Sequence, residues 1–425
     1  MKVSGTVRPP GDKSISHRAL MLGALGRESH FDGVLAGEDV QSTARVLRQL
    51  GARITPVRNG VRVTVTGHRW HRPGVLHCGN SGTTARLLLG LLAGHPLTAR
   101  LTGDRSLRRR PMRRVAEPLR AMGAEITEGP RDALPLTIHG GRLHAFTYTT
   151  PVASAQVKSA LLFAGLTGNV PVTVREPYRS RDHTERLFVH LGLGLHARDG
   201  AVVYEPPGER PRISGFDLVV PGDASSAAFL VVAAALAESG ELVVENVGVN
   251  PTRTGFLVVL ERMGVSVDRV NLRDSGGEPV ADLVVRPAPS IRATEVGAAE
   301  IPSLVDEVPI LAVLASRAVG ETVFREVGEL RVKESDRLEL VAANLRALGV
   351  QAAASGNDLH VLGGAAAPRG RVETAEDHRL AMAFAVLGTV PGAQVRLSER
   401  HSVAISYPTF FQDLKRIGRP ARSRD

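Results

Sequence analysis

Pro10-Gly11-Asp12-Lys13-Ser14-Ile15-Ser16-His17-Arg18 is followed by the apolar run Ala19-Leu20-Met21-Leu22-Gly23-Ala24-Leu25. A Pro-Gly turn, a polar opening and then an apolar segment indicate a helix that begins close to Lys13. The first N–H groups of a helix have no partner within it, and the helix dipole favours negative charge there. Lys13, Ser14 and Arg18 are therefore candidates for binding an anion at this helix N-terminus.

The same polar opening recurs along the chain, which indicates an internal repeat. Pro221-Gly222-Asp223-Ala224-Ser225-Ser226 repeats it before the apolar run Ala227–Ala237, about half the chain later. Looser copies begin at Gly79, Pro151, Pro302 and Glu376. We expect Asp12 and Asp223 to be turn or helix-capping residues.

A second signature supports the same count of repeats. Amphipathic runs end in an apolar residue and a glycine, which is a common helix C-cap, at Gly51, Gly123, Gly192, Gly264, Gly349 and Gly418. Strand-like residues follow each of these glycines except the last. We therefore predict six α/β units of about 70 residues, each with two helices and several short strands, although small α/β units of unrelated origin look alike at this level.

Three units in each half would form two similar domains. The chain would cross between them near Gly11-Asp12 and Pro221-Gly222, so that residues 13–221 form one domain and residues 1–12 and 222–425 form the other. We expect residues 419–425 to be a disordered tail. If the six openings converge, six helix N-termini would face one cleft between the domains and attract anions.

Composition limits the class of protein. The 425 residues are 43% hydrophobic and 23% charged, as in ordinary globular proteins. A chain of this length is too long for one compact core, which indicates two domains. The single cysteine, Cys78, excludes an internal disulfide framework and fits a reducing compartment. Without an N-terminal apolar segment or an apolar run of about 20 residues, we expect a cytoplasmic protein.

The charge balance favours anionic ligands. The formal net charge is +10, and of 53 basic residues only five are lysines. A compact, titratable ammonium group is not equivalent to a guanidinium, and Lys13, Lys158 and Lys333 all lie within motifs. A nucleic-acid-binding protein would also be basic, but aromatic residues make up only 4% of the chain, which is few for stacking on bases.

Nine strings in order along the chain resemble the 5-enolpyruvylshikimate-3-phosphate synthase family, also called 3-phosphoshikimate 1-carboxyvinyltransferases. Each string alone is weak, but together they span most of the chain. They are Gly11–Arg18, Gly79–Thr83, Arg110–Met112, Ser154–Lys158, Arg181–Glu185, Asn250–Arg253, Asp306–Pro309, Leu330–Arg337 and Asp377–Arg379. The resemblance implies an α/β fold of two similar domains, each of three βαβαββ repeats in an inverse α/β barrel-like arrangement, with the active site in the interdomain cleft.

The resemblance also implies the reaction. The family transfers the enolpyruvyl group of phosphoenolpyruvate to the 5-hydroxyl of shikimate 3-phosphate by addition and elimination, with release of phosphate, on the pathway to aromatic amino acids. These two small molecules are the expected partners. We expect no metal, no organic cofactor, no nucleic-acid or membrane partner, and a monomer.

The required chemistry matches the residue types. Both substrates carry a phosphate and a carboxylate, which call for several cations, and the proton transfers call for an acid and a base. The resemblance implies that the catalytic residues are Lys13, Asp306 and Glu334. It implies that shikimate 3-phosphate is bound by Lys13, Ser14, Arg18, Ser154, Ala155, Gln156, Arg181, Asp306 and Lys333. It implies that phosphoenolpyruvate is bound by Lys13, Gly82, Arg110, Gln156, Arg337 and Arg379.

Simpler interpretations remain open for single residues. Glu334 and Arg337 could be a solvated helix pair, and His17 and His378 are expected to be structural. Family members often carry a lysine just before the Ser406-Tyr407-Pro408 string, where this chain has Ile405. Several strings resemble the glyphosate-tolerant subgroup, whereas Gly82 is the residue of sensitive forms, so tolerance stays open.

Two related enzymes are alternatives. The sister family that acts on UDP-N-acetylglucosamine usually has a reactive cysteine in the loop before its Arg-Pro pair, and residues 103–110 contain no cysteine. A relative recruited to another hydroxylated acid would keep the phosphoenolpyruvate residues and lose the acceptor contacts, but Ser154, Gln156 and Arg181 are present.

Overall fold

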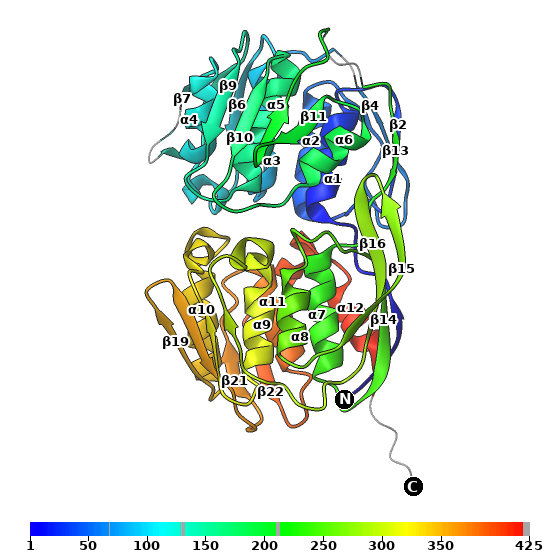
Figure 1. Ribbon diagram of the computed structural model, residues 1–425, viewed down its shortest axis with the longest axis vertical. Coiled ribbons are helices and arrows are strands. Elements are labelled where there is room, and N and C mark those ends of the chain that lie inside the picture. Colours follow the sequence, from blue (N-terminus) through cyan, green and yellow to red (C-terminus); the bar gives the residue numbers. More distant parts are fainter. Residues whose placement is uncertain (68, 128, 130–131, 210–212, 420–425) are drawn as a thin grey trace. The chain divides into compact units, whose positions relative to one another are not determined.

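The computed structural model describes residues 1–67, 69–127, 129, 132–209 and 213–419, and the chain divides into two compact units (Figure 1). Unit 1 contains Met1–Pro10, Pro221–Arg273 and the chain from Pro279 onward. Unit 2 contains Gly11–Val220 together with Asp274–Glu278. The sequence-based limits assigned no part of residues 222–425 to the other domain, and so missed this short segment.

Unit 2 is built from three four-stranded mixed sheets. One repeat runs β5 (Val75–His77), α3 (Gly82–Ala93), β6 (Thr98–Thr102), α4 (Arg113–Ala121), β7 (Glu125–Thr127) and β8 (Leu136–His139). The next runs β9 (Phe146–Thr149), α5 (Ala155–Gly168), β10 (Val172–Arg175), α6 (His183–His190), β11 (Leu195–Arg198) and β12 (Ala201–Tyr204). In both, the first two strands are parallel and the rest pair antiparallel, which is a βαβαββ order.

The first repeat of unit 2 takes one strand from the end of the unit. It contains α1 (Lys13–Gly23), β2 (Ser29–Asp32), α2 (Glu38–Gln49), β3 (Arg53–Ile54) and β4 (Val63–Thr66). Its missing parallel strand is β13 (Asp217–Val219), which pairs with β2. The chain of unit 2 therefore closes on itself.

Unit 1 follows this plan in its first two repeats, whereas its third repeat forms a sheet of only two strands within the described residues. Its first repeat comprises β1 (Lys2–Val7), α7 (Ala224–Ala235), β14 (Ser239–Gly248), α8 (Gly255–Arg262), β15 (Val267–Ser275) and β16 (Glu278–Val285). The second comprises β17 (Glu295–Val296), α9 (Val308–Ala315), β18 (Glu321–Phe324), α10 (Arg337–Ala347), β19 (Gln351–Ser355) and β20 (Asp358–Leu362). The third comprises β21 (Arg369–Val372), α11 (His378–Leu387), β22 (Gln394–Leu397), α12 (Phe410–Ile417) and β23 (Gly418–Arg419).

One helix of each repeat lies inside its unit, with the sheets outside. All residues of α7 and α9 are buried, and α7, α9 and α11 pack against one another (Figure 1). In unit 2, α3 packs against both α1 and α5. Small and apolar residues on every face allow this close approach: a Cβ on Gly90 of α3 would lie 2.0 Å from the carbonyl oxygen of Ala160. The predicted fold, an α/β protein with an inverse α/β barrel-like arrangement, is confirmed, and its sheets are small and mixed.

Five of the six predicted openings are helix N-caps. The side chains of Asp12, Ser81, Ser154, Asp223 and Asp377 accept hydrogen bonds from the first-turn N–H groups of α1, α3, α5, α7 and α11. The exception follows Pro302, where two short 3₁₀ turns, Ile301–Ser303 and Val305–Glu307, precede α9. The prediction of Asp12 and Asp223 as capping residues is therefore confirmed.

The predicted C-cap glycines behave alike except for the last. Gly51, Gly123, Gly192, Gly264 and Gly349 all have positive φ, between 66° and 113°, which glycine adopts at little cost. Gly418 has a φ of −90° and continues into β23, which pairs antiparallel with β1. The expectation of no strand there was wrong, and Arg419 belongs to this strand rather than to the tail. The rest of the predicted tail, residues 420–425, lies outside the described residues.

Candidate active site

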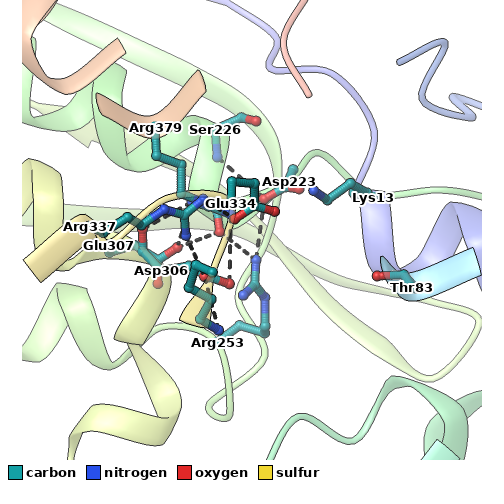
Figure 2. A network of polar contacts seen from close by, with 12 residues as sticks. Lys13, Thr83, Asp223, Ser226, Arg253, Asp306, Glu307, Glu334, Arg337 and Arg379 are labelled. Carbon is teal, nitrogen blue, oxygen red and sulfur yellow. Dashed lines mark hydrogen bonds and ion pairs between the residues drawn. The ribbon is translucent and has the colours of Figure 1, made fainter. Parts of the chain in front are cut away.

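Arg337, the first residue of α10, is surrounded by carboxylates in unit 1 (Figure 2). Its Nε donates to Asp377 Oδ2 at 2.7 Å, Nη2 to Glu334 Oε2 at 2.5 Å and Nη1 to Asp306 Oδ1 at 3.3 Å. The residue is 1% exposed. Burial alone would lower the pKa of the guanidinium, but Asp377, Glu334 and Asp306 outweigh burial and raise it. Arg337 is thus a charged group held in one orientation.

Asp306 lies at the centre of the same cluster because two further cations approach it. Arg379 donates through Nη1 to the Asp306 backbone oxygen at 3.1 Å, and its Nη2 lies 3.7 Å from Oδ2. The Nζ of Lys333 lies 3.7 Å from Asp306 Oδ1 and 2.7 Å from Glu329 Oε1. Unit 1 thus brings together every site residue that was expected from its part of the chain: Asp306, Lys333, Glu334, Arg337 and Arg379.

A second set of contacts, all between buried residues, holds Arg379 through Glu307. Glu307 is fully buried, its Oε1 accepts a hydrogen bond from Ser225 Oγ, and it lies 3.6 Å from Arg379 Nη1 (Figure 2). Ser225 Oγ in turn accepts from Nη2 of Arg253 at 2.7 Å. The same Nη2 lies 3.3 Å from Oδ1 of Asp223, the cap of α7. This set connects the N-terminus of α7 to the cluster around Asp306.

In unit 2, Arg18 is a buried cation that is bound by neutral groups. Its Nε donates to Thr184 Oγ1 at 2.6 Å, Nη2 to Ser159 Oγ at 2.7 Å and Nη1 to the Ser14 carbonyl at 2.9 Å. Within the described residues, no carboxylate accepts a hydrogen bond from it. Burial lowers the pKa of Arg18 to about 10, against the effect of nearby carboxylates, and Arg181 lowers it further. Such a site favours an anionic ligand.

Gln156, in the first turn of α5, organises a second basic region. Its Oε1 accepts from Arg86 Nη1 at 2.8 Å and from Arg114 Nη2 at 3.3 Å, while its Nε2 donates to Thr83 Oγ1 at 3.1 Å. Arg86 is 5% exposed. Two guanidinium groups thus meet at one amide oxygen, which concentrates positive charge beside the N-terminus of α5.

Gly82 joins this region to Arg110. Arg110 donates through Nη2 to Asn80 Oδ1 at 2.6 Å and to Ser106 Oγ at 3.3 Å. A Cβ on Gly82 would lie 2.9 Å from Nη1 of Arg86 and 3.5 Å from Nη1 of Arg110. The absence of a side chain therefore lets both guanidinium groups approach the N-terminus of α3.

Of the remaining expected residues of unit 2, Arg181 directly precedes Asp182, the N-cap of α6, and the others lie at helix N-termini. Lys13 is the first residue of α1, and its Nζ lies 3.2 Å from Oδ2 of Asp39 in α2. Ser14 follows it. Ser154 caps α5, and Ala155 is the first residue of that helix. A helix N-terminus presents free N–H groups, which favour an anionic ligand.

Several simpler interpretations can now be judged. Arg337 is too buried for Glu334 and Arg337 to be a solvated surface pair. His17 is buried and hydrogen-bonded to Thr43, and burial, followed by Lys13 and Arg18, lowers its pKa well below the usual value. Both observations fit a neutral, structural histidine.

The structure also locates the single cysteine and Ile405, which stands where family members often carry a lysine. Cys78 is buried, and burial raises the pKa of its thiol to about 12, so it is not an activated nucleophile. Ile405 ends a 3₁₀ turn, His401–Ile405. Among the described residues, no group of His, Cys, Asp and Glu side chains could hold a metal ion. None of the helices in those ranges combines the length and apolar character needed to cross a bilayer.

Sequence reasoning missed the residues that hold the expected ones in place: Asp39, Arg86, Arg114, Ser159, Thr184, Ser225, Arg253 and Glu307. Arg86 offered a signal, because it is a charge within the apolar run of α3. Glu307 and Arg253 lay inside quoted strings without a role. Ser225 lies in the repeated opening. For Asp39 no local signal exists, because its partner Lys13 lies on another helix.

Comparisons with known proteins identify the family of this chain. The family model described as EPSP synthase (3-phosphoshikimate 1-carboxyvinyltransferase) matches residues 1–414. The 3-phosphoshikimate 1-carboxyvinyltransferase of Synechococcus sp. (strain RCC307) is 48% identical over 427 residues, covering 98% of this chain and 97% of that protein. The protein of the same name from Thermus thermophilus is 50% identical over 419 residues, covering 97% and 96%.

Solved structures give the same result for the fold. EPSP synthase from Acinetobacter baumannii superposes with a TM-score of 0.86 at 38% identity, covering 98% of this chain and 96% of that one. The enolpyruvyl transferase NikO from Streptomyces tendae, at 20% identity and a TM-score of 0.77, covers 98% and 95% and shares the fold. The chain therefore belongs to the EPSP synthase family, and it is a 3-phosphoshikimate 1-carboxyvinyltransferase of the shikimate pathway.

Proposed function

We propose that the clusters of the two units act on the two substrates that the family implies, phosphoenolpyruvate and shikimate 3-phosphate. Each unit is then an enolpyruvyltransferase domain of three repeats. The observation that carries the assignment of residues is Arg18, a buried cation whose hydrogen-bond acceptors are all neutral. A phosphate would supply the negative charge that this environment favours.

Shikimate 3-phosphate is assigned to the residues around Arg18 and the N-terminus of α5. Ser154, Ala155, Gln156 and Arg181 would hold its 3-phosphate, since they combine a helix N-terminus, an amide and a second guanidinium. Ser14 and Arg18 would contact the same substrate. Lys13 would contact both substrates, and Asp306 and Lys333 would contact the acceptor hydroxyl.

Phosphoenolpyruvate is assigned to arginines of both clusters. Gly82, Arg110 and Gln156 would bind it from unit 2, and Arg337 and Arg379 from unit 1. Planar guanidinium groups match carboxylate and phosphate oxygens in pairs. The ion pairs that now fix Arg337 keep it oriented, so less conformational entropy is lost when the substrate binds.

The reaction divides into addition and elimination. In the addition, the 5-oxygen of shikimate 3-phosphate bonds to C2 of phosphoenolpyruvate, the hydroxyl proton passes to Asp306, and C3 receives a proton from Glu334. In the elimination, C3 gives up a proton and the C2–O bond to phosphate breaks, so that phosphate leaves with the electron pair. Lys13 would stabilise the charge that develops and assist the proton transfers.

The direct test is phosphate release on mixing phosphoenolpyruvate with shikimate 3-phosphate, with UDP-N-acetylglucosamine as the control acceptor. Release with shikimate 3-phosphate alone supports the proposal. If phosphate is released only with UDP-N-acetylglucosamine, or only with another hydroxylated acid, the chain has one of the two related activities instead.

We also propose a cytoplasmic monomer without nucleic-acid or membrane partners. The single buried cysteine supports a reducing compartment. Light scattering after size exclusion tests the monomer, and a gel shift with DNA and RNA at low salt tests the absence of nucleic-acid binding. A shift at low salt that disappears steeply with added salt would contradict this part of the proposal.

A further inference from the structure

Lys158 is a buried lysine that the proposed reaction does not use. It lies in α5, one turn after Ser154, and its side chain is 1% exposed. Its Nζ lies 2.6 Å from Glu176 Oε2, 2.7 Å from Glu185 Oε1 and 3.5 Å from the Ser180 carbonyl. The contacts to Glu176 and Ser180 are hydrogen bonds, and the contact to Glu185 is an ion pair. Both carboxylates are largely shielded from solvent, at 8% and 11% exposure.

The electrostatics show that this cluster is tightly coupled. Burial would lower the pKa of Lys158, but Glu185 and Glu176 outweigh burial and raise it. Burial raises the pKa of Glu185 despite the attraction of Lys158. Without the ammonium, two carboxylates would be buried close together, which is strongly unfavourable.

The partners of Lys158 lie beside segments that are assigned to the acceptor substrate. Glu176 Oε1 accepts a hydrogen bond from the backbone N–H of Ser154 at 3.1 Å, and its Oε2 accepts from the N–H of Ser180 at 3.3 Å. Ser180 directly precedes Arg181. Glu185 directly follows Thr184, whose hydroxyl binds the Nε of Arg18.

We propose that Lys158 and Glu176 are positioning residues for the phosphate of the acceptor substrate. The ammonium fixes Glu176, and Glu176 fixes the backbone of Ser154 and of the segment before Arg181. An arginine is not equivalent to this lysine, because its planar fork directs its donors differently from a compact ammonium group. The inference rests on the proposed assignment of Ser154 and Arg181 to that phosphate.

The experiment compares Glu176→Gln with Glu185→Gln, which is the matched control. Both remove one carboxylate charge next to Lys158, but only Glu176 contacts the Ser154 N–H. Three donors point at Glu176, and a glutamine replaces one acceptor oxygen by a donor, so at least one of these hydrogen bonds is lost. We expect E176Q to raise the KM for shikimate 3-phosphate about tenfold, with the KM for phosphoenolpyruvate and kcat within about twofold. E185Q should change all three by less than about threefold.

Calorimetric titration with shikimate 3-phosphate in the absence of phosphoenolpyruvate should show the same loss of affinity in E176Q. If E176Q does not fold, the double variant K158M/E176Q removes two opposite charges together and should show the tenfold rise in a folded protein. Equal rises in both KM values, or equal effects of E176Q and E185Q, would mean that the cluster only stabilises the fold and would overturn the inference.

A further variant separates this inference from the proposed function. Ser154→Ala removes the proposed phosphate contact itself. If S154A raises the KM for shikimate 3-phosphate and E176Q does not, the positioning role is wrong while the assignment stands. If neither variant has an effect, the assignment of Ser154 fails, and the positioning role fails with it.

Discussion

Replacing Asp377 by asparagine tests whether a fixed Arg337 is needed to bind phosphoenolpyruvate. Asp377 is fully buried. Its Oδ1 accepts the N–H of Arg379 at 2.9 Å, which caps α11, and Arg337 Nη2 at 3.3 Å. Its Oδ2 accepts Arg337 Nε at 2.7 Å and Ser335 Oγ at 3.0 Å. Asparagine has the same shape but only one acceptor oxygen. If that oxygen keeps the helix cap, an amide N–H faces the N–H of Arg337.

The magnitude follows from this contact. A buried hydrogen bond between charged groups contributes about 1.5–3 kcal/mol, and an unsatisfied donor has a similar cost. Arg337 keeps two carboxylate partners, Asp306 and Glu334, so it stays charged, but the Nε hydrogen bond that helps to orient it is lost. If the loss appears in substrate binding, the KM for phosphoenolpyruvate should rise by about tenfold to a hundredfold. The KM for shikimate 3-phosphate should change little.

The assay is phosphate release at varied concentrations of each substrate, with circular dichroism to confirm folding. Asp336→Asn is the matched control, because Asp336 caps α10 through Glu339 N at 3.1 Å and pairs with Arg331 at 3.2 Å, but its side chain is 41% exposed. An exposed pair contributes less than about 1 kcal/mol, so D336N should stay within about fivefold. A D377N enzyme with an unchanged KM for phosphoenolpyruvate, or one no worse than D336N, would refute the reasoning.

Three other changes give distinct outcomes. Glu334→Gln or Asp306→Ala should fold normally but lose most turnover, about a hundredfold or more in kcat, and near-full activity in either variant would show that its role is misassigned. Gly82→Ala places a methyl group 2.9 Å from Nη1 of Arg86, which must shift, so the KM for phosphoenolpyruvate should rise about tenfold; inhibition by glyphosate, measured against phosphoenolpyruvate, should weaken in parallel, and unchanged kinetics would show that the space is not used. The folded-state pKa of His17 lies below its usual value because of burial and neighbouring cations; the stability that is present above about pH 6.5 is therefore lost as the pH falls, by up to about 1.4 kcal/mol per pH unit. Thermal unfolding between pH 7.5 and 5.5 should show that His17→Asn removes this loss of stability. Identical pH profiles of the variant and the unchanged protein would contradict the role of His17.

The local chemistry of helix ends could be predicted from the sequence. A capping Asp or Ser and a glycine with positive φ act over a few residues, so Asp12, Asp223 and Gly51 could be interpreted without knowing what lies around them. The opening at Pro302 does not cap an α-helix, because local sequence alone does not decide between a 3₁₀ turn and an α-helix. Helix α9 begins only at Val308, just before Pro309. The resemblance to a family supplied the candidate roles, which periodicity could not.

The pairing of side chains across the fold could not be predicted. Arg337 meets Asp306 and Asp377, which lie 31 and 40 residues away along the chain, and such encounters depend on how the repeats pack. The buried set of Lys158 and Glu176 is similar. The scarcity of lysines pointed to Lys158, but its partners come from segments that no local pattern connects to α5.

The route of the chain through the two units has a consequence for biosynthesis. Residues 11–220 of unit 2 form one uninterrupted segment, whereas β1 of unit 1 pairs in parallel with β14, Ser239–Gly248, and antiparallel with β23. On the ribosome, the three inner helices of unit 2 are therefore complete while β1 still lacks both neighbours. Because domains fold as units in the order of their synthesis, the inserted segment assembles first. Strand β1, which is synthesised before unit 2, is then among the last strands to pair.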